Sequence, residues 1–235
     1  MQKQFLNYQF MITSFWKILS ALPMTLNIAI VTMTFSLVLS FLVAMVKINK
    51  VRVLSRLATI YVSFIRGTPL LVQIYLSYYG IPKFLNHIND KFGWSLNVNS
   101  VPVIIFVYVA FILNMSAYMS ETFRASILSV EKGQMEAAIS IGMSKWQAMR
   151  RIILPQAFVI ALPNLGNSFI GLLKETSLAF VVSVVELMGK AKIVGAAGLN
   201  FFEVYIVVAL IYWGVCIIVE KLLAILEKKI RIGGQ

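Results

Sequence analysis

The stretch EAAISIGMSKWQAMRRIILP, residues 136–155, is polar and charged within a chain that is otherwise mostly apolar. Glu136 stands three residues after Gly133, which can serve as an N-cap, and its carboxylate suits the positive end of a helix dipole. Gly142 tolerates a positive φ, so a helix can end there and the chain can turn. Ser144, followed by a glutamine three residues later, has the spacing of a capping box. The stretch predicts a helix, a turn and a second helix.

The composition around this stretch indicates an all-α polytopic membrane protein. Of its 235 residues, 60% are hydrophobic and 13% are charged, whereas about a quarter of the residues in soluble domains are charged. Apolar runs of about the 20 residues that a bilayer requires predict about five transmembrane helices. These spans cover residues 18–46, 57–79 (interrupted by Arg66), 101–120, 152–173 and 204–219. The run 178–188 is too short to cross, so we interpret it as buried or re-entrant.

The charge distribution predicts the orientation. The chain has 21 Lys and Arg against 9 acidic residues, and most of the basic residues fall in segments that five spans would place on one side. The positive-inside rule then puts the N-terminus outside, the C-terminus inside, and residues 124–151 in the cytoplasm. The basic excess follows from topology and gives no support to binding of nucleic acid.

Several classes of protein and site are disfavoured. The single Cys216 excludes an intrachain disulfide, and one histidine without companions predicts no metal site. An enzyme is disfavoured because the sequence contains neither HExxH nor GxSxG. No repeat, low-complexity tract or linker divides the chain, so we expect a single transmembrane domain over residues 1–235.

Two interpretations of the 136–155 hairpin follow from its pattern. An amphipathic hairpin can lie on lipid headgroups, or it can dock into the groove of a partner protein. Small side chains at Ala137 and Ala138 would permit close approach to such a partner, and Trp146 recurs at helical spacing with later apolar residues. The pattern alone leaves both interpretations open.

The same residues carry a resemblance. The spacing E-A-A, three residues, Gly, nine residues, I-x-L-P is met by Glu136, Ala137, Ala138, Gly142, Ile152, Leu154 and Pro155. This pattern resembles the EAA loop of the membrane subunits of bacterial ATP-binding-cassette importers. RGTPLLVQ (66–73), AYMSETFRASI (117–127) and ALPNLGNSFIGLLKETSLA (161–179) are similar to the polar amino-acid permease branch of that family.

The resemblance implies a type I importer permease fold in the bacterial plasma (inner) membrane, with the hairpin as the coupling element for a separate cytoplasmic ATPase. It assigns that coupling role to Glu136, Ala137, Ala138, Gly142 and Trp146. The chain lacks G-x-x-x-x-G-K-[ST], so we expect it to bind no cofactor and the partner subunit to use ATP and Mg.

The other implied partners are an extracytoplasmic solute-binding protein and a second permease, either an identical copy or a sibling. Small residues at helical spacing in the first span, Ser36, Ser40 and Ala44, would allow close approach either to the chain's own bundle or to a neighbour.

Polar residues in two spans mark either hydrogen bonding between helices or a solute pathway. One stripe consists of Asn114, Tyr118 and Glu121. The second consists of Asn164, Asn167, Ser168, Gly171, Lys174 and Glu175.

An amino acid presents an ammonium and a carboxylate, so a site at membrane depth needs both an acid and hydrogen-bond donors. Glu121 and Glu175 are the expected ammonium ligands. The expected donors to the carboxylate are Asn114, Asn167, Thr176 and Ser177.

Arg66 lies within a span and is followed by Thr68 and by Pro69, and the proline loosens the helix. We favour a gating or structural pair of Arg66 with a glutamate over direct contact with a substrate.

The segment SLAFVVSVVELMGKAKIVGAAG (177–198) looks similar to that of permeases for L-cystine and related sulphur amino acids, so we expect an L-cystine importer. The alternative function is an ion-coupled secondary amino-acid transporter, which also uses buried acids and broken helices.

Overall fold

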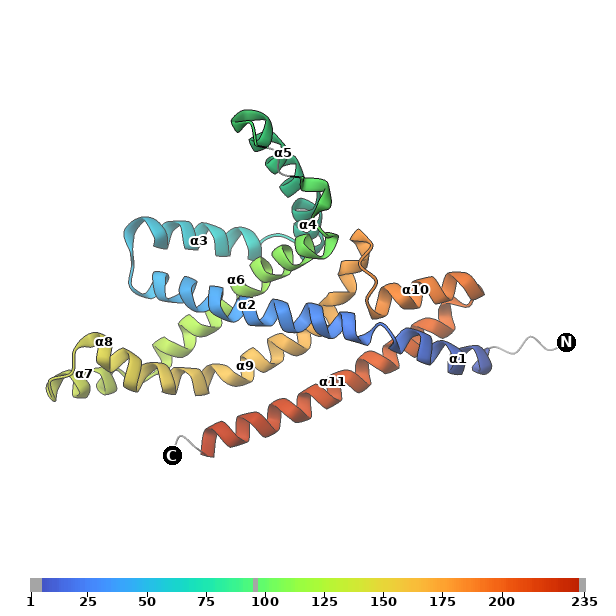
Figure 1. Ribbon diagram of the computed structural model, residues 1–235. Coiled ribbons are helices and arrows are strands. Elements are labelled where there is room, and N and C mark those ends of the chain that lie inside the picture. The colour runs from blue at the N-terminus through green and yellow to red at the C-terminus, as the bar shows by residue number, and fades with distance from the viewer. Residues whose placement is uncertain (1–5, 95–96, 233–235) are drawn as a thin grey trace.

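The computed structural model describes residues 6–94 and 97–232, and the regular elements in those ranges are all helices (Figure 1). In chain order they are α1 (Tyr8–Leu19), α2 (Leu22–Ile48), α3 (Arg52–Arg66), α4 (Leu70–Tyr75), α5 (Ile81–Phe92), α6 (Val103–Ser129), α7 (Lys132–Ser140), α8 (Lys145–Ala148), α9 (Leu154–Glu175), α10 (Leu187–Gly198) and α11 (Phe201–Ile232). Short π segments cover Leu76–Gly80 and Met149–Ile153, and 3-10 segments cover Val98–Ser100 and Thr176–Val182. The all-α class predicted from the sequence is confirmed.

Four helical stretches are long and apolar enough to cross a membrane: Leu22–Ile48, Val103–Ser129, Lys145–Val182 and Phe201–Ile230. The pair Arg52–Arg66 and Leu70–Phe92 makes a fifth if it counts as one span. The prediction of about five spans is therefore confirmed. The first predicted span, residues 18–46, corresponds to α2, and the separate helix α1 precedes it and lies with α10 at one end of the bundle (Figure 1). The α7–α8 hairpin lies at the opposite end, where α11 also ends (Figure 1).

The second predicted span, residues 57–79, is wrong as a single crossing helix. Its two halves are bent by 111° at a short break, and α5 projects away from the rest of the bundle (Figure 1). Pro69 has an extended backbone with ψ 139° and cannot donate an amide hydrogen bond, so the helix stops before it and restarts after it. The predicted span ends at Tyr79, whereas the helix continues to Phe92.

The close packing of α2 against α6 depends on small side chains. Ser36, Ser40 and Ala44 are all fully buried, and the Ser36 hydroxyl donates a hydrogen bond of 3.2 Å to the carbonyl of Ile112 on α6. Small residues let two helix backbones approach closely. The van der Waals contacts of this packing hold the helices together in lipid, where no hydrophobic driving force acts between them. Of the two alternatives for this stripe, the structure shows contact with the chain's own bundle.

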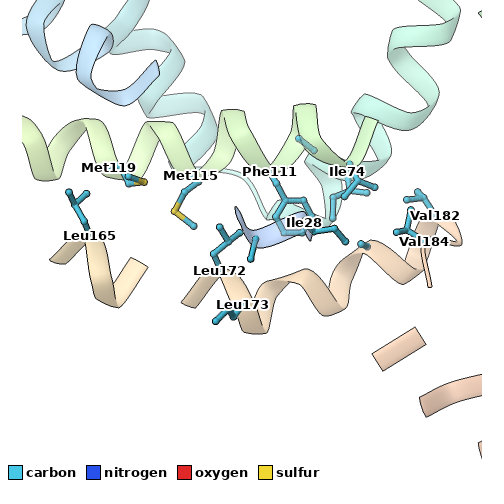
Figure 2. Close-up of a cluster of buried hydrophobic side chains, with 14 of the residues drawn as sticks. Ile28, Ile74, Phe111, Met115, Met119, Leu165, Leu172, Leu173, Val182 and Val184 are labelled. Carbon is cyan, nitrogen blue, oxygen red and sulfur yellow. The ribbon is translucent and has the colours of Figure 1, made fainter. Parts of the chain in front are cut away.

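The main core lies where α2, α6, α9 and α4 meet. Figure 2 shows Ile28, Phe111, Leu172 and Ile74 facing one another from these four helices. Each is almost completely buried. Because lipid tails are as apolar as these side chains, the contacts stabilise the bundle through van der Waals packing.

The apolar run 178–188 is buried but does not cross as a helix of its own. It continues the fourth span as the 3-10 segment, turns at Ser183, which has φ 65°, and enters α10. Ala179, Val182, Val184 and Leu187 are buried, which confirms the interpretation as a buried segment.

Glu186 caps α10 from a fully buried position. Its two carboxylate oxygens accept hydrogen bonds from the amides of Gly189 (2.7 Å) and Met188 (3.0 Å) and from the Tyr212 hydroxyl (2.7 Å) on α11. Burial raises the pKa of the Glu186 carboxyl, and the three hydrogen bonds oppose that rise. This carboxyl group joins α10 to α11.

We expect Glu186→Ala to lower the free energy of unfolding by about 1–3 kcal/mol, because it removes the cap and leaves the Tyr212 hydroxyl buried without its partner. Tyr212→Phe should cost less, since the two amide bonds remain. Thermal unfolding of the purified protein in detergent measures both. A Glu186→Ala variant as stable as the wild type would contradict the account.

Candidate functional site

A cavity of about 340 Å³ lies between the broken helix, α6 and α9. Three elements contribute its polar side chains: Thr68 from the break, Asn114 and Tyr118 from α6, and Ser168 and Glu175 from α9. Pro69 and Gly171 form further parts of the wall. The structure thus brings together four of the nine residues that the sequence assigned to the pathway, from segments more than forty positions apart in the chain.

Asn114 is held in place by Gln73, which the sequence analysis missed. The Asn114 side-chain amide donates to the Gln73 carbonyl oxygen at 2.9 Å. The Gln73 amide in turn donates to the carbonyls of Ile65 (2.8 Å) and Thr68 (3.0 Å), and to the Thr68 hydroxyl (2.9 Å). A buried polar residue in an apolar run, four positions after a proline, was the available signal.

Glu175 is the acidic group of this cavity. It is the last residue of α9, and its side chain remains solvent-accessible. Glu175 forms no ion pair within 4.0 Å with a residue of the described ranges, whereas Glu121 forms two. The cavity therefore combines an unpaired carboxylate with the amide of Asn114 and the hydroxyls of Thr68, Tyr118 and Ser168.

A second cavity of about 540 Å³ lies nearer the α7–α8 end of α6. Its charged lining consists of Lys47, Arg66 and Glu121, and Tyr118 also lines it. Tyr118 therefore stands between the two cavities.

Glu121 lies in the second cavity, not the first, and two cations hold its carboxylate. Lys47 on α2 forms an ion pair with one oxygen, and Arg124 donates to the other at 2.9 Å. The predicted role of Glu121 as an ammonium ligand would require displacement of these partners. Its position instead joins α2 to α6 near the hairpin.

Arg66 forms no ion pair within 4.0 Å with a glutamate in the described part of the chain, and its gating or structural role stays a prediction. Its guanidinium lies 5.4 Å from the centroid of the Tyr118 ring, at a distance where the cation and the ring attract each other. Glu121, which lines the same cavity as Arg66, already forms ion pairs with Lys47 and Arg124.

The other predicted pathway residues do not line the first cavity. Asn167 lines a separate cavity of about 210 Å³ between α9 and α11, together with Glu220. Asn164 is exposed on α9. The hydroxyls of Thr176 and Ser177 each donate at 2.8 Å to backbone carbonyls three residues earlier, and Thr176 is fully buried. The second stripe therefore divides between two faces of α9.

The hairpin forms a turn fixed by two local motifs. Gly142 has φ 88°, and its amide and that of Met143 donate to the carbonyls of Ile139 (2.9 Å) and Ala138 (3.1 Å). This pair of hydrogen bonds is the Schellman arrangement that ends a helix. The capping box at Ser144 is complete, with both reciprocal bonds to Gln147 formed at 2.8 and 3.2 Å. Both predictions are confirmed.

The predicted start of the first hairpin helix is wrong. α7 begins at Lys132 with Glu131 in the N-cap position, so Gly133 lies inside the helix. Glu136 is an exposed residue of the same helix. The prediction failed because glycine has no side chain that could cap a helix at Gly133. Nothing therefore favours that start over the observed one, which lies two residues earlier.

The hairpin presents large apolar side chains outward. Ile141 is 78% exposed and Trp146 is 62% exposed, whereas Ala138 and Ala148 are buried against the hairpin's own helices. Ala137 is exposed, so the two alanines face in different directions. An exposed apolar pair on a rigid turn is typical of a surface that another protein or a membrane covers.

Comparison with known proteins agrees with this geometry. The family described as "Binding-protein-dependent transport system inner membrane component" matches residues 36–232. The "Probable amino-acid permease protein YxeN" of Bacillus subtilis is 41% identical over 223 residues, which cover 95% of each chain. The "L-cystine transport system permease protein TcyB" of the same organism is 41% identical over 219 residues, which cover 92% of this chain and 88% of TcyB.

Solved structures support the same fold. A chain in the crystal structure of an amino acid ABC transporter with histidines superimposes with a TM-score of 0.82 at 34% identity, covering 96% of this chain and 100% of that one. A chain of the inward-facing MetNI methionine ABC transporter has a TM-score of 0.71 at 15% identity, covering 92% and 96%, and shows the fold alone.

The type I importer fold, the family match over most of the chain and the similarity to amino-acid permeases together identify the family of the protein. It belongs to the family of binding-protein-dependent inner-membrane transport components and is a multi-pass permease subunit of an amino-acid ATP-binding-cassette importer, in which a separate subunit carries out ATP hydrolysis.

Proposed function

We propose that the cavity lined by Thr68, Asn114, Tyr118, Ser168 and Glu175 receives the amino acid during its passage. The observation that carries this proposal is the unpaired Glu175 carboxylate, which shares one cavity with several hydrogen-bond donors. The ammonium would pair with Glu175, and the carboxylate would accept from the Asn114 amide and the Tyr118 hydroxyl. The hydroxyls of Thr68 and Ser168 donate to backbone carbonyls at 3.0 and 2.8 Å and would have to rotate to reach the substrate. Such a site leaves neither charge of the substrate without a partner in a medium of low dielectric.

The Arg66–Tyr118 pair is the proposed gate. Tyr118 lines both cavities, and the guanidinium of Arg66 lies over its ring from the second one. A substrate that leaves Glu175 toward the hairpin end would have to pass Tyr118. Arg66 is then the next cation that its carboxylate meets.

The α7–α8 hairpin is the proposed docking element for a separate ATPase, which would bind and hydrolyse ATP with Mg. The exposed Ile141 and Trp146 would enter a groove of that subunit. With the hairpin in the cytoplasm, the C-terminus lies inside and the N-terminus outside. A second permease, either identical or a sibling, and an extracytoplasmic solute-binding protein would complete the importer.

L-Cystine or a related polar or sulphur amino acid is the proposed substrate. Support comes from the 41% identity to TcyB, whose name specifies L-cystine, and from the 177–198 segment. Similar permeases carry other substrate names, such as nopaline for NocM of Agrobacterium fabrum at 38% identity. An external binding protein would make much of the selection.

Uptake of labelled L-cystine into vesicles that contain the chain, its ATPase and its binding protein tests this function. We expect uptake that requires ATP and that unlabelled cystine blocks more strongly than other amino acids. ATP-dependent uptake of a different amino acid would reject the cystine assignment. Uptake driven by an ion gradient without ATP would support a secondary transporter and contradict the proposal.

Glu175→Gln should raise the apparent KM for uptake about ten-fold or more, because a neutral amide replaces the charge that pairs with the ammonium. Glu220→Gln is the matched control, since Glu220 lines the other cavity of α9. Initial uptake rates over a range of substrate concentrations measure both. An unchanged KM in Glu175→Gln would exclude Glu175 as a substrate ligand.

Gly142→Asp should leave the spans inserted but abolish ATP-driven uptake. The substitution strains the positive φ and places a charge on the proposed docking turn. Gly133→Asp is the control, because Gly133 lies in open space on the same hairpin within a regular helix. Retained uptake in Gly142→Asp, with normal membrane insertion, would reject the docking assignment.

A further inference from the structure

We propose that the chain binds an anionic phospholipid in a cavity between α1 and α10. This cavity has a volume of about 420 Å³ and lies at the end of the bundle opposite the hairpin (Figure 1). It is separate from both cavities of the pathway. The inference does not depend on the substrate or on the proposed transport route.

The first observation is the charge of the cavity. Lys17 of α1 and Lys190 of α10 both line it, together with the hydroxyl-bearing Ser20, and no acidic residue does. Neither lysine forms an ion pair within 4.0 Å among residues 6–94 and 97–232. Two uncompensated ammonium groups on one cavity favour an anion.

The second observation is the apolar remainder of the wall. Phe10, Ile193, Val194 and Ala197 line the same cavity. The ring of Phe10 packs directly on the backbone of Gly198, where a Cβ atom would come within 2.4 Å of the ring. The absence of a side chain at Gly198 therefore lets Phe10 form this wall. A free inorganic anion would make no use of these surfaces, whereas the glycerol and acyl portion of a lipid would.

The third observation concerns the level of α1 in the membrane. Tyr8, Ile12 and Trp16 recur every four residues and are 63%, 68% and 68% exposed, while Ser14 and Ile18 on the same helix are buried. Exposed aromatic residues of this kind sit at the boundary between headgroups and acyl chains. Lys17 follows Trp16 directly, so its ammonium lies where lipid phosphates are found.

The charge and the apolar wall together select the class of lipid. A phosphodiester without a compensating ammonium, as in phosphatidylglycerol, satisfies both lysines. Phosphatidylcholine carries its own cation, which the lysines would repel. Each lysine near an anionic lipid surface strengthens the binding of that lipid. Bound lipid would bridge α1 to α10.

The test uses the purified full-length permease in detergent, stripped of lipid and titrated separately with dioleoylphosphatidylglycerol, dioleoylphosphatidylcholine and inorganic phosphate. Native mass spectrometry measures binding, and thermal unfolding measures stabilisation. We expect phosphatidylglycerol to bind about ten-fold more tightly than phosphatidylcholine and to raise the unfolding temperature. Inorganic phosphate should do neither.

The Lys17→Gln/Lys190→Gln double variant should lose the preference for phosphatidylglycerol. Lys228→Gln/Lys229→Gln is the matched control, because it removes the same charge from the other end of α11 and should keep the preference. Equal binding of the two lipids by the wild type, or unchanged preference in the Lys17/Lys190 variant, would overturn the proposal. Stabilisation by phosphate equal to that by phosphatidylglycerol would overturn the lipid part and leave a simple anion site.

Discussion

The break between α3 and α4 is the constraint on which the pathway depends. Within a bilayer, carbonyl groups freed by an interrupted helix have no water to bind, so protein must satisfy them. Gln73 does so, with its amide on the carbonyls of Ile65 and Thr68 and its carbonyl oxygen on Asn114. One side chain thus stabilises the break and orients the main amide donor of the cavity, which explains why Thr68 and Asn114 lie together.

The same principle explains why the chain tolerates charge within its bundle. Glu121 is held between Lys47 and Arg124, and Glu186 is held by two amides and a hydroxyl. Both carboxylates have structural partners. Glu175 differs because it forms no ion pair within 4.0 Å with a described residue, although the charge of its neighbour Lys174 acts on it. This difference makes it the acid available to a substrate.

Sequence patterns predicted the features that depend on nearby residues. The turn at Gly142 and the capping box at Ser144 are decided within six positions, so a single sequence contains the whole signal. The number of spans follows from apolar length alone. The start of α7 was predicted wrongly because Gly133 carries no capping side chain.

The pathway was predictable only in part because it depends on tertiary contacts. Ser168 and Asn167 are neighbours in sequence and differ by about 100° around the helix, so one lines the cavity with Glu175 and the other faces α11. The sequence pattern could not separate them without knowing where α6 and α11 lie. Likewise, nothing local marks Lys47 as the partner of Glu121, 74 positions away.

That separation of neighbouring residues offers the most direct measurement. In a Cys216→Ser background, Ser168→Cys and Asn167→Cys each place a single thiol on one of the two cavities. The rate of thiol labelling is measured in the assembled importer with and without a saturating transported amino acid that contains no disulfide. We expect the amino acid to slow labelling at position 168 and to leave labelling at position 167 unchanged. Equal protection at both positions, or protection at 167 alone, would contradict it.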